Sequence, residues 1–180
     1  MDKHTTDDLR VRRTHKLLYN ALLDLMEKYS FETITVKQIC DLAMVHRTTF
    51  YTHFNDKFDL LSHALRQIAE DEFKLGQLTP SESFQELFSI ATKHKKLFSQ
   101  LLAEERDSLR NLLRREMGSG MKQHLIEDCS IENNSIDMQI AVEAYVGAVL
   151  GVLNWWIENN MPIDQENLYK QLTEWVFLKQ

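Results

Sequence analysis

The stretch from Ile34 to Leu61 most constrains what this chain can fold into. It reads ITVKQICDLAMVHRTTFYTHFNDKFDLL. Thr35, followed three residues later by Gln38, is typical of a capping box, in which each side chain reaches the other residue's backbone N–H. Ile39 and Leu42 then recur at helical spacing and are expected to face a core. The pattern predicts a short helix that ends in a tight turn at residues 44–45.

A second short helix is predicted over His46–His53, and it has two chemically different faces. Phe50 and Phe54 lie four residues apart, so they share the face directed at a core. The opposite face carries donors and a cation: His46, Arg47, Thr48, Tyr51 and Thr52. A short helix that is anchored by aromatic rings and presents such groups suits the DNA major groove. The stretch therefore predicts a helix-turn-helix that binds DNA.

The net charge of −6 is unevenly distributed along the chain. Residues 1–57 hold nine Lys and Arg against eight Asp and Glu, whereas residues 58–180 hold twelve against nineteen. Between Leu9 and Arg47 the count is seven basic residues against four acidic ones. The local charge, rather than the total, determines the field at a phosphate backbone. The first segment is thus compatible with DNA, and modest non-specific affinity is expected.

These residues resemble the helix-turn-helix of the TetR family of transcriptional regulators. The resemblance covers roughly residues 9–69, and the run Thr-Phe-Tyr-x-His-Phe at 49–54 together with Lys57 carries most of it. This chain has Met44 where the family usually has a turn glycine, and His46 where it usually has serine. A methionine at positive φ costs on the order of 1 kcal/mol. Histidine is also a poorer N-cap than serine.

The resemblance implies a DNA-binding domain over residues 9–69, with the helix-turn-helix at about 35–53, that binds a double-stranded, palindromic operator. In the family, Tyr51 and Lys57 typically bind phosphates. The basic residues at 10–16 usually meet the DNA backbone, although a solvated charged end is an equal alternative for each of them. The implied DNA-binding residues are Arg13, Thr35, Lys37, Val45, His46, Arg47, Thr48, Thr49, Tyr51, His53 and Lys57.

Apolar residues at helical spacing predict an all-α chain. A first helix is expected over Leu9–Tyr29, with a buried stripe formed by Leu18, Ala21, Leu22, Leu25 and Met26. A helix capped by Asp56 is expected to run to about Leu75 and to connect two domains. Thr79 should cap the next helix, with Pro80 at its first position.

Two features of the segment after residue 100 leave its helices less defined. Gly118-Ser119-Gly120 allows either one helix with a weak point or two helices with a kink. Asp128–Ser135 is expected to form a polar loop. Arg106, Arg110, Arg114 and Arg115 are interpreted as a solvated face.

From Ile136 to Ile157 the chain is apolar on almost all sides. The stretch is long enough to cross a membrane, and Gly147 with Gly151 forms a close-packing motif. Internal charges at Asp137 and Glu143, and the lack of a basic flank, argue against a membrane. A soluble helix of this kind is buried by its own domain and by a partner. The prediction is a homodimer with no membrane contact.

The resemblance further implies a C-terminal helical ligand-binding and dimerisation domain over residues 76–180, whose last two helices pack against their copies. The candidate dimer residues are Tyr145, Gly147, Gly151, Leu168, Leu172 and Trp175. An apolar pocket for an unknown small-molecule effector is the other expectation, with ordinary core packing as the alternative for most of its residues. The candidate ligand-binding residues are Phe84, Phe88, Phe98, Leu101, Met117, Met121, Tyr145 and Trp155. Trp155 and Trp156, about 100° apart on a helix, are both expected in the core.

Nothing in the sequence indicates an enzyme, and no catalytic residue, metal ligand or cofactor is expected. No Ser/His/Asp grouping, phosphate-binding glycine loop or carboxylate pair stands out, and the seven histidines are scattered. Cys40 and Cys129 match no metal spacing, so buried thiols are expected in a reducing, cytoplasmic setting. The N-terminus lacks the apolar core of a signal peptide.

The function expected from these observations is that of a sequence-specific DNA-binding regulator. The more specific expectation is a homodimeric repressor that responds to a small molecule. The alternative is a coactivator or protein-interaction module with the same fold that does not itself bind DNA. Retention of Arg47, Thr48, Tyr51 and Lys57 argues against that alternative.

Overall fold

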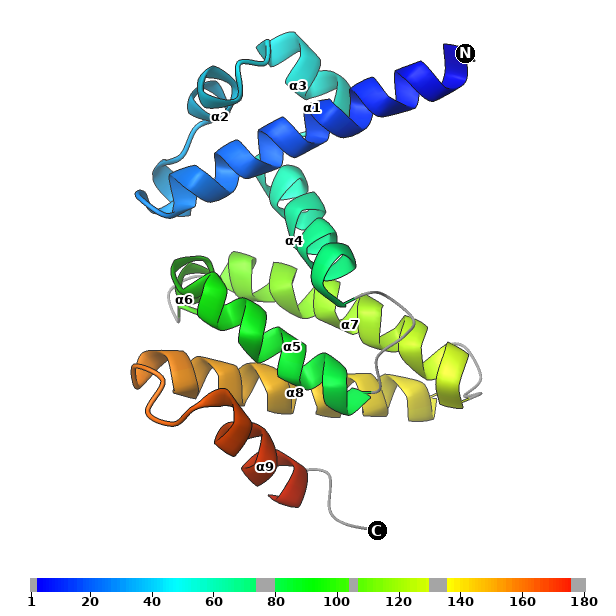
Figure 1. The fold of residues 1–180 in the computed structure, drawn as a ribbon, viewed down its shortest axis with the longest axis vertical. Coiled ribbons are helices and arrows are strands. Elements are labelled where there is room, and N and C mark those ends of the chain that lie inside the picture. The colour runs from blue at the N-terminus through cyan, green and yellow to red at the C-terminus, as the bar shows by residue number, and fades with distance from the viewer. Residues whose placement is uncertain (1–2, 74–79, 104–106, 130–135, 176–180) are drawn as a thin grey trace. The chain divides into compact units, whose positions relative to one another are not determined.

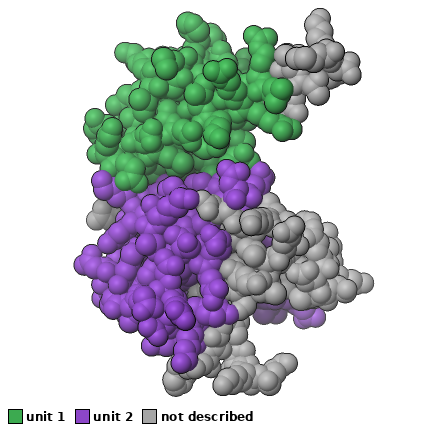
Figure 2. Space-filling view, viewed as in Figure 1, with its two compact units in different colours: residues 1–67 green, residues 68–180 purple. Residues whose placement is uncertain are grey.

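The computed structural model describes residues 3–73, 80–103, 107–129 and 136–175. Within those ranges the chain forms nine α-helices and one short 3₁₀ turn, without a strand (Figure 1). The predicted all-α class is therefore confirmed. The chain divides into two compact units, residues 1–67 and residues 68–180 (Figure 2).

The first unit contains three helices, a 3₁₀ turn and most of a fourth helix. Their bounds are α1 Lys3–Met26, η1 Phe31–Thr33, α2 Val36–Ala43, α3 Arg47–His53 and α4 Lys57–Phe73. Helix α2 packs on α1 and on α3. The expected stripe of α1 is buried as predicted: Leu18, Ala21, Leu22, Leu25 and Met26. This apolar stripe gives α1 a buried face within the unit, and α2 packs on α1.

Helix α1 begins and ends earlier than the predicted range Leu9–Tyr29. It starts at Lys3, because the polar residues before Leu9 can extend a helix although they contribute no apolar periodicity. Leu9 itself is 63% exposed, so it does not mark the start of a buried stripe. The helix ends at Met26, and the chain then turns through Ser30 into η1.

The predicted capping box at the start of α2 is confirmed. The Gln38 backbone N–H donates to Thr35 Oγ1 over 3.2 Å, and the Thr35 N–H donates to Gln38 Oε1 over 2.8 Å. Leu42 was expected in the core but is 49% exposed. The buried stripe of α2 consists of Ile39, Cys40 and Ala43, and Leu42 lies about 100° around the helix from its centre.

The turn between α2 and α3 has a left-handed residue at the position where the resembled family usually has glycine. Met44 adopts φ 54° and ψ 40°, and its side chain is 91% exposed. Its N–H donates to Asp41 O over 3.3 Å, and the Val45 N–H donates to Cys40 O over 3.0 Å. These bonds satisfy carbonyls at the end of α2 and compensate for a conformation that glycine would adopt without strain.

The second unit contains the end of α4 and five further helices. Their bounds are α5 Pro80–Lys93, α6 Lys95–Leu102, α7 Asp107–Cys129, α8 Ile136–Glu158 and α9 Gln165–Trp175. Helix α8 packs on α6 and α7, and α5 packs on α6 and α9. The predicted cap at Thr79 and the loop residues 130–135 lie outside the described residues.

Helix α7 is continuous through Gly118-Ser119-Gly120, which decides between the two possibilities that the sequence allowed. A Cβ atom at Gly118 would lie 3.5 Å from Val142 Cγ1, an ordinary van der Waals distance, so the space at this position does not require glycine. The helix also runs on to Cys129. Asp128 and Cys129, which were predicted to begin a polar loop, are instead the last two residues of α7.

Helix α9 is fastened by polar contacts to α5 and to the end of α8. Asp164 caps it, since Asp164 Oδ1 accepts the Asn167 N–H over 2.8 Å, and this bond is the main cause of the lowered pKa of Asp164. Gln165 Nε2 donates to Thr92 Oγ1 over 2.6 Å. Trp156 Nε1 donates to Ile163 O over 2.9 Å. These hydrogen bonds fix the N-terminal end of α9 against α5 and α8.

Two interpretations of side chains in the second unit were wrong. Trp156 is 2% exposed, but Trp155 is 48% exposed, because the two rings point to different sides of α8. Arg110 donates to the carbonyl of Leu102 at the end of α6, and Arg114 pairs with Glu143 of α8. These two arginines therefore tie helices together and are not simply a solvated face.

Helix α8 is long and apolar enough to cross a membrane by its length and composition, and it is the only such helix within the described residues. A core helix passes the same test, so one such helix is weak evidence for a membrane. Seven of its side chains are buried in its own unit: Met138, Val146, Val149, Leu150, Leu153, Trp156 and Ile157. One side of α8 therefore packs on the other helices of its own unit.

Candidate nucleic-acid interface

Helix α3 has one face locked into the core and one face open to solvent. Phe50 is fully buried and Phe54 is 5% exposed, with their ring centroids 5.7 Å apart. The opposite face carries exposed side chains only: His46, Arg47, Thr48, Tyr51 and Thr52. The two aromatic rings fix the rotation of α3, and that rotation decides which groups it presents.

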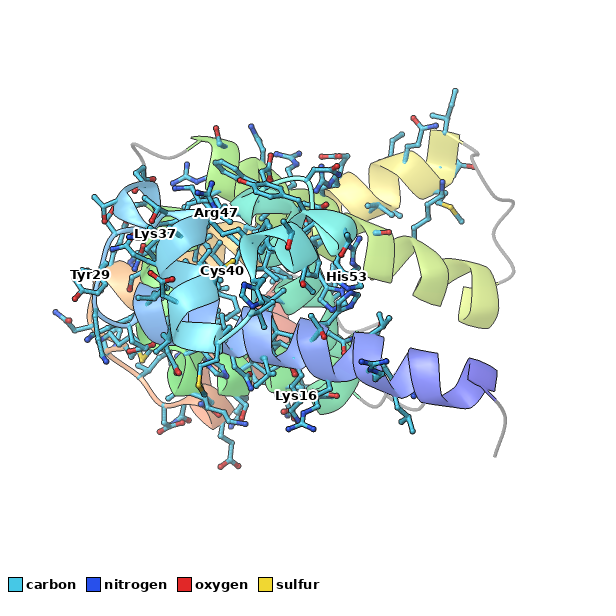
Figure 3. The ribbon with its side chains drawn as sticks, turned by 90° about the horizontal axis from the view of Figure 1, so that it is seen from above. Lys16, Tyr29, Lys37, Cys40, Arg47 and His53 are labelled. Atoms are coloured by element: carbon cyan, nitrogen blue, oxygen red, sulfur yellow. The ribbon has the colours of Figure 1, made fainter. Side chains whose placement is uncertain are left out.

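Helices α2 and α3 present cations at the surface of the first unit. Lys37 on α2 and Arg47 on α3 are both exposed (Figure 3). His46 is the N-cap of α3, but its side chain makes no capping hydrogen bond. Its imidazole therefore stays available at the start of the helix, next to Arg47.

The basic residues of α1 are also at the surface. Arg10, Arg12, Arg13 and Lys16 are all exposed. Their guanidinium and ammonium groups can therefore meet a phosphate backbone without desolvation of a buried charge. Arg13, which the family resemblance implied as a DNA contact, belongs to this exposed set.

Several predicted DNA-binding residues instead make contacts within the protein or are only partly exposed. Thr35 is occupied by the capping box, and Val45 and Thr49 are only partly exposed. The His53 ring lies against His15, with centroids 4.9 Å apart. Lys57 Nζ donates to three backbone carbonyls. The structure thus brings Arg13, Lys37, His46, Arg47, Thr48 and Tyr51 to the surface with Thr35, whose side chain is used by the capping box. Val45, Thr49, His53 and Lys57 are only partly exposed.

Three histidines meet where α1, α3 and α4 pack, and the sequence did not reveal this cluster. The His15 ring centroid lies 4.9 Å from that of His53 and 4.8 Å from that of His63. Phe54 completes the cluster, 4.8 Å from His15. No group of three or more His, Cys, Asp or Glu side chains among the described residues is arranged to hold a metal ion. The helical register of His15 beside buried Leu18 was the only signal for its position.

This cluster predicts that stability falls on acidification. The pKa of His15 is lowered, first by burial and then by His63 and His53. Below its ordinary value of about 6.5, the unfolded chain therefore binds a proton more readily than the folded one. Stability should be full above that value and decline as the pH falls through it towards the lower folded pKa. Thermal unfolding between pH 5 and 8 measures this decline.

The histidine prediction has a matched control. His15→Phe should flatten the decline, because the ring contacts stay but the titrating group is lost. His46→Gln should retain the wild-type pH dependence, because His46 is exposed at the N-cap of α3. An unchanged decline in His15→Phe would contradict the assignment to this cluster.

The predicted effector-binding residues differ in exposure, and Trp155 is the most exposed of those described, at 48%. Phe88, Phe98 and Leu101 are buried core residues, and the Phe88 ring lies 5.3 Å from that of Trp156. Met117, Met121 and Tyr145 are partly exposed, and burial raises the pKa of Tyr145 to about 12. The side chain of Phe84 lies outside the described residues.

A groove between α7 and α8 is not lined by any predicted effector residue. Its volume is about 510 Å³ and it is open to solvent. Its lining residues are Arg114, Ile136, Gln139, Ile140, Glu143 and Ala144. The groove follows the exposed side of α8.

Comparison with known proteins gives one family match and one curated relative. The family model TetR_C_8, described as a transcriptional regulator C-terminal region, matches residues 79–177. The HTH-type transcriptional regulator YxbF of Bacillus subtilis (strain 168), described as uncharacterized, is 27% identical over 189 aligned positions. That alignment covers 99% of this chain and 48% of the relative, so the chain spans about half the length of the curated relative.

Solved structures share the fold. A TetR transcriptional regulator from Streptococcus agalactiae 2603V is 22% identical with a TM-score of 0.65, covering 97% of this chain and 99% of that one. The dihydroxyacetone kinase operon activator DhaS is 17% identical with a TM-score of 0.63, covering 91% and 94%. FadR from Bacillus subtilis, in complex with stearoyl-CoA, is 17% identical with a TM-score of 0.58, covering 88% and 95%.

These identities establish a shared fold alone, whereas the family match extends over more than half of the chain. The helix-turn-helix with its buried aromatic pair and the helical second unit agree with that match. The protein belongs to the TetR family of transcriptional regulators.

Proposed function

We propose that the protein is a sequence-specific DNA-binding regulator that acts as a homodimer on a palindromic operator in the cytoplasm. Residues 9–69 form the DNA-binding domain, and residues 76–180 form the dimerisation and effector domain. The observation that carries this proposal is helix α3. Buried Phe50 and Phe54 fix one of its faces, and the other face presents Arg47, Thr48 and Tyr51 to solvent.

The exposed residues of α3 divide by the chemistry of their contacts. Arg47 and Thr48 stand in the first turn of the helix, where recognition helices contact base edges. Arginine pairs with guanine through two hydrogen bonds, and the threonine methyl suits thymine. Tyr51, Lys37 and Arg13 are assigned to phosphates, which position the protein without reading sequence.

The exposed side of α8 supports the homodimer. Ile136 is 74% exposed, Ile140 61% and Trp155 48%. Gly147 and Gly151 lie on the same exposed side, and a Cβ at either would meet nothing within 4 Å. Leu168 is only 3% exposed in the single chain, so it is left out of the interface. Tyr145 is partly exposed, and the side chains of Leu172 and Trp175 lie outside the described residues. The proposed interface, called the α8 stripe below, is Ile136, Ile140, Ala144, Gly147, Gly151 and Trp155.

The C-terminal domain is proposed to bind an apolar or amphipathic small molecule. The fold neighbour FadR was solved with stearoyl-CoA, which supports a ligand of this kind. NalD, another neighbour with a TM-score of 0.58, is a repressor, and we infer repression here too. The activator DhaS has the same fold, so a reporter gene placed behind the selected operator tests the direction of regulation.

Selection from random DNA, followed by substitution of Arg47, tests the DNA-binding proposal. Arg47→Ala should lose about 1–3 kcal/mol of binding free energy on the selected operator and relax preference at one base position. Lys37→Ala is the matched control: it should weaken all sequences alike and lower the salt slope by about one unit. Affinity for each sequence is measured by fluorescence anisotropy at several salt concentrations.

The results separate the proposal from its alternative. If no sequence is enriched and Arg47→Ala changes nothing, the chain is a protein-interaction module and not a DNA-binding regulator. If both variants weaken binding equally on all sequences, Arg47 contacts phosphate and the base reader lies elsewhere on α3.

A further inference from the structure

The side-chain ammonium of Lys57 donates three hydrogen bonds to backbone carbonyl groups. Its Nζ donates to Phe31 O over 2.8 Å, to Glu32 O over 3.0 Å and to Ile34 O over 2.8 Å. A lysine ammonium has three N–H groups and no more. All three are therefore used, and none remains to donate to a phosphate oxygen.

The surroundings of the ammonium favour this arrangement. Nζ lies 4.7 Å from the centre of the Phe31 ring, in cation–π range. Phe31 is fully buried, and its ring lies 4.9 Å from that of Phe58. Burial lowers the pKa of Lys57, while Glu32 and Asp56 act in the opposite direction. The charge is thus partly removed from water and solvated by carbonyls instead.

The three carbonyls sit at one end of the helix-turn-helix and Lys57 sits at the other. Phe31 and Glu32 belong to η1, and Ile34 directly precedes the capping residue of α2. Lys57 is the first residue of α4, just after the end of α3. The contacts therefore join the two chain ends that enter and leave the pair α2–α3.

We propose that Lys57 is a positioning residue that clamps the two ends of the helix-turn-helix together and makes no phosphate contact. This inference rests on the proposed function, since it concerns how α3 is held for DNA. It replaces the phosphate role that the family resemblance implied for this lysine. The clamp fixes α2 and α3 relative to α4. Loss of these hydrogen bonds therefore shifts the exposed face of α3 but removes no direct contact with DNA.

Substitution of Lys57 distinguishes a clamp from a phosphate contact through the salt dependence of DNA binding. Lys57→Met keeps the aliphatic stem and should weaken binding to the selected operator while leaving the salt slope unchanged. A lost phosphate contact would instead lower the slope by about one unit. Exposed Lys37→Met is the matched control and should lower the slope by that amount. The thermal midpoint should fall on the order of 5 °C in Lys57→Met, with Lys37→Met unchanged.

The conservative variant gives an independent readout. Lys57→Arg keeps the positive charge, but a planar guanidinium fork does not match three converging carbonyls. It should therefore fail to restore operator affinity or the thermal midpoint. Restoration by arginine, or a slope reduced by about one unit in Lys57→Met, overturns the proposal.

A direct measurement on the wild-type chain decides the matter if Lys57→Met does not fold. The ¹⁵N–¹H NMR signal of the Lys57 ammonium should exchange slowly with water and stay in place when operator DNA is added. A signal that exchanges as fast as that of Lys37, or moves on DNA binding, contradicts the clamp. If the wild type binds no DNA, the proposed function fails, whereas the exchange rate and the thermal midpoint still judge the clamp.

Discussion

Replacement of Phe50 by alanine is expected to remove about 3–5 kcal/mol from the free energy of unfolding of the first unit. Phe50 is fully buried, and its ring lies 5.7 Å from that of Phe54 and 5.3 Å from that of Tyr51. Alanine would leave a cavity under a helix of seven residues. A helix this short is not stable alone, so α3 depends on this contact.

Native-state hydrogen exchange measures the effect in the first unit alone, because the two units need not unfold together. The free energy of opening measured at the protected amides of α1 and α2 should fall by the same amount as the free energy of unfolding of this unit. Tyr51→Ala, at the neighbouring position that is 52% exposed, should cost at most about 1.5 kcal/mol. If Phe50→Ala costs no more than Tyr51→Ala, the aromatic contact does not hold α3 in place.

Gly151→Leu is expected to convert the proposed dimer to a monomer and to abolish tight binding to a palindromic operator. A Cβ at Gly151 meets nothing within 4 Å in the single chain, so leucine should not disturb the fold. Leucine also favours a helix over glycine by about 1 kcal/mol. Any loss of assembly therefore reports contact with a second chain at the α8 stripe.

The dimer matters for DNA because each recognition helix reads only one half-site. Two half-sites about one DNA turn apart, roughly 34–36 Å, are bound together only if the dimer holds both helices. A monomer loses the second contact and with it the gain from effective concentration. Affinity for the full operator should then fall by about 10²-fold or more, towards that of a single half-site.

Sedimentation at micromolar concentration measures the assembly, and Gly120→Leu is the matched control. Gly120 lies in the interior of α7 and a Cβ there also meets nothing within 4 Å, but the residue is not part of the α8 stripe. The control should remain a dimer and bind operator as the wild type does. A monomeric wild type would remove the premise, and wild type that associates with lipid vesicles instead would show that the stripe faces a membrane.

The local features of the DNA-binding unit could be predicted because their partners are close in sequence. The capping box joins Thr35 to Gln38, and the cap of α9 joins Asp164 to Asn167. Met44 stands where the family usually has a turn glycine, and its φ is 54°. Helical spacing likewise predicted the burial of Phe50 and Phe54. In each case the residues concerned lie no more than four positions apart, so a local sequence pattern is enough to identify them.

What the sequence by itself determined is the all-α class, the helix-turn-helix and the family. Only the tertiary structure decided which side of the apolar helix α8 is covered and which distant residues meet. Trp155 and Trp156 are adjacent and identical in chemistry, but one is 48% exposed and the other 2% exposed, because neighbouring helices cover one side of α8. The bonds of Lys57 to carbonyls 23–26 residues away, and the meeting of His15 with His63, have the same cause. Contacts between distant residues depend on the packing of whole helices, which no local pattern encodes.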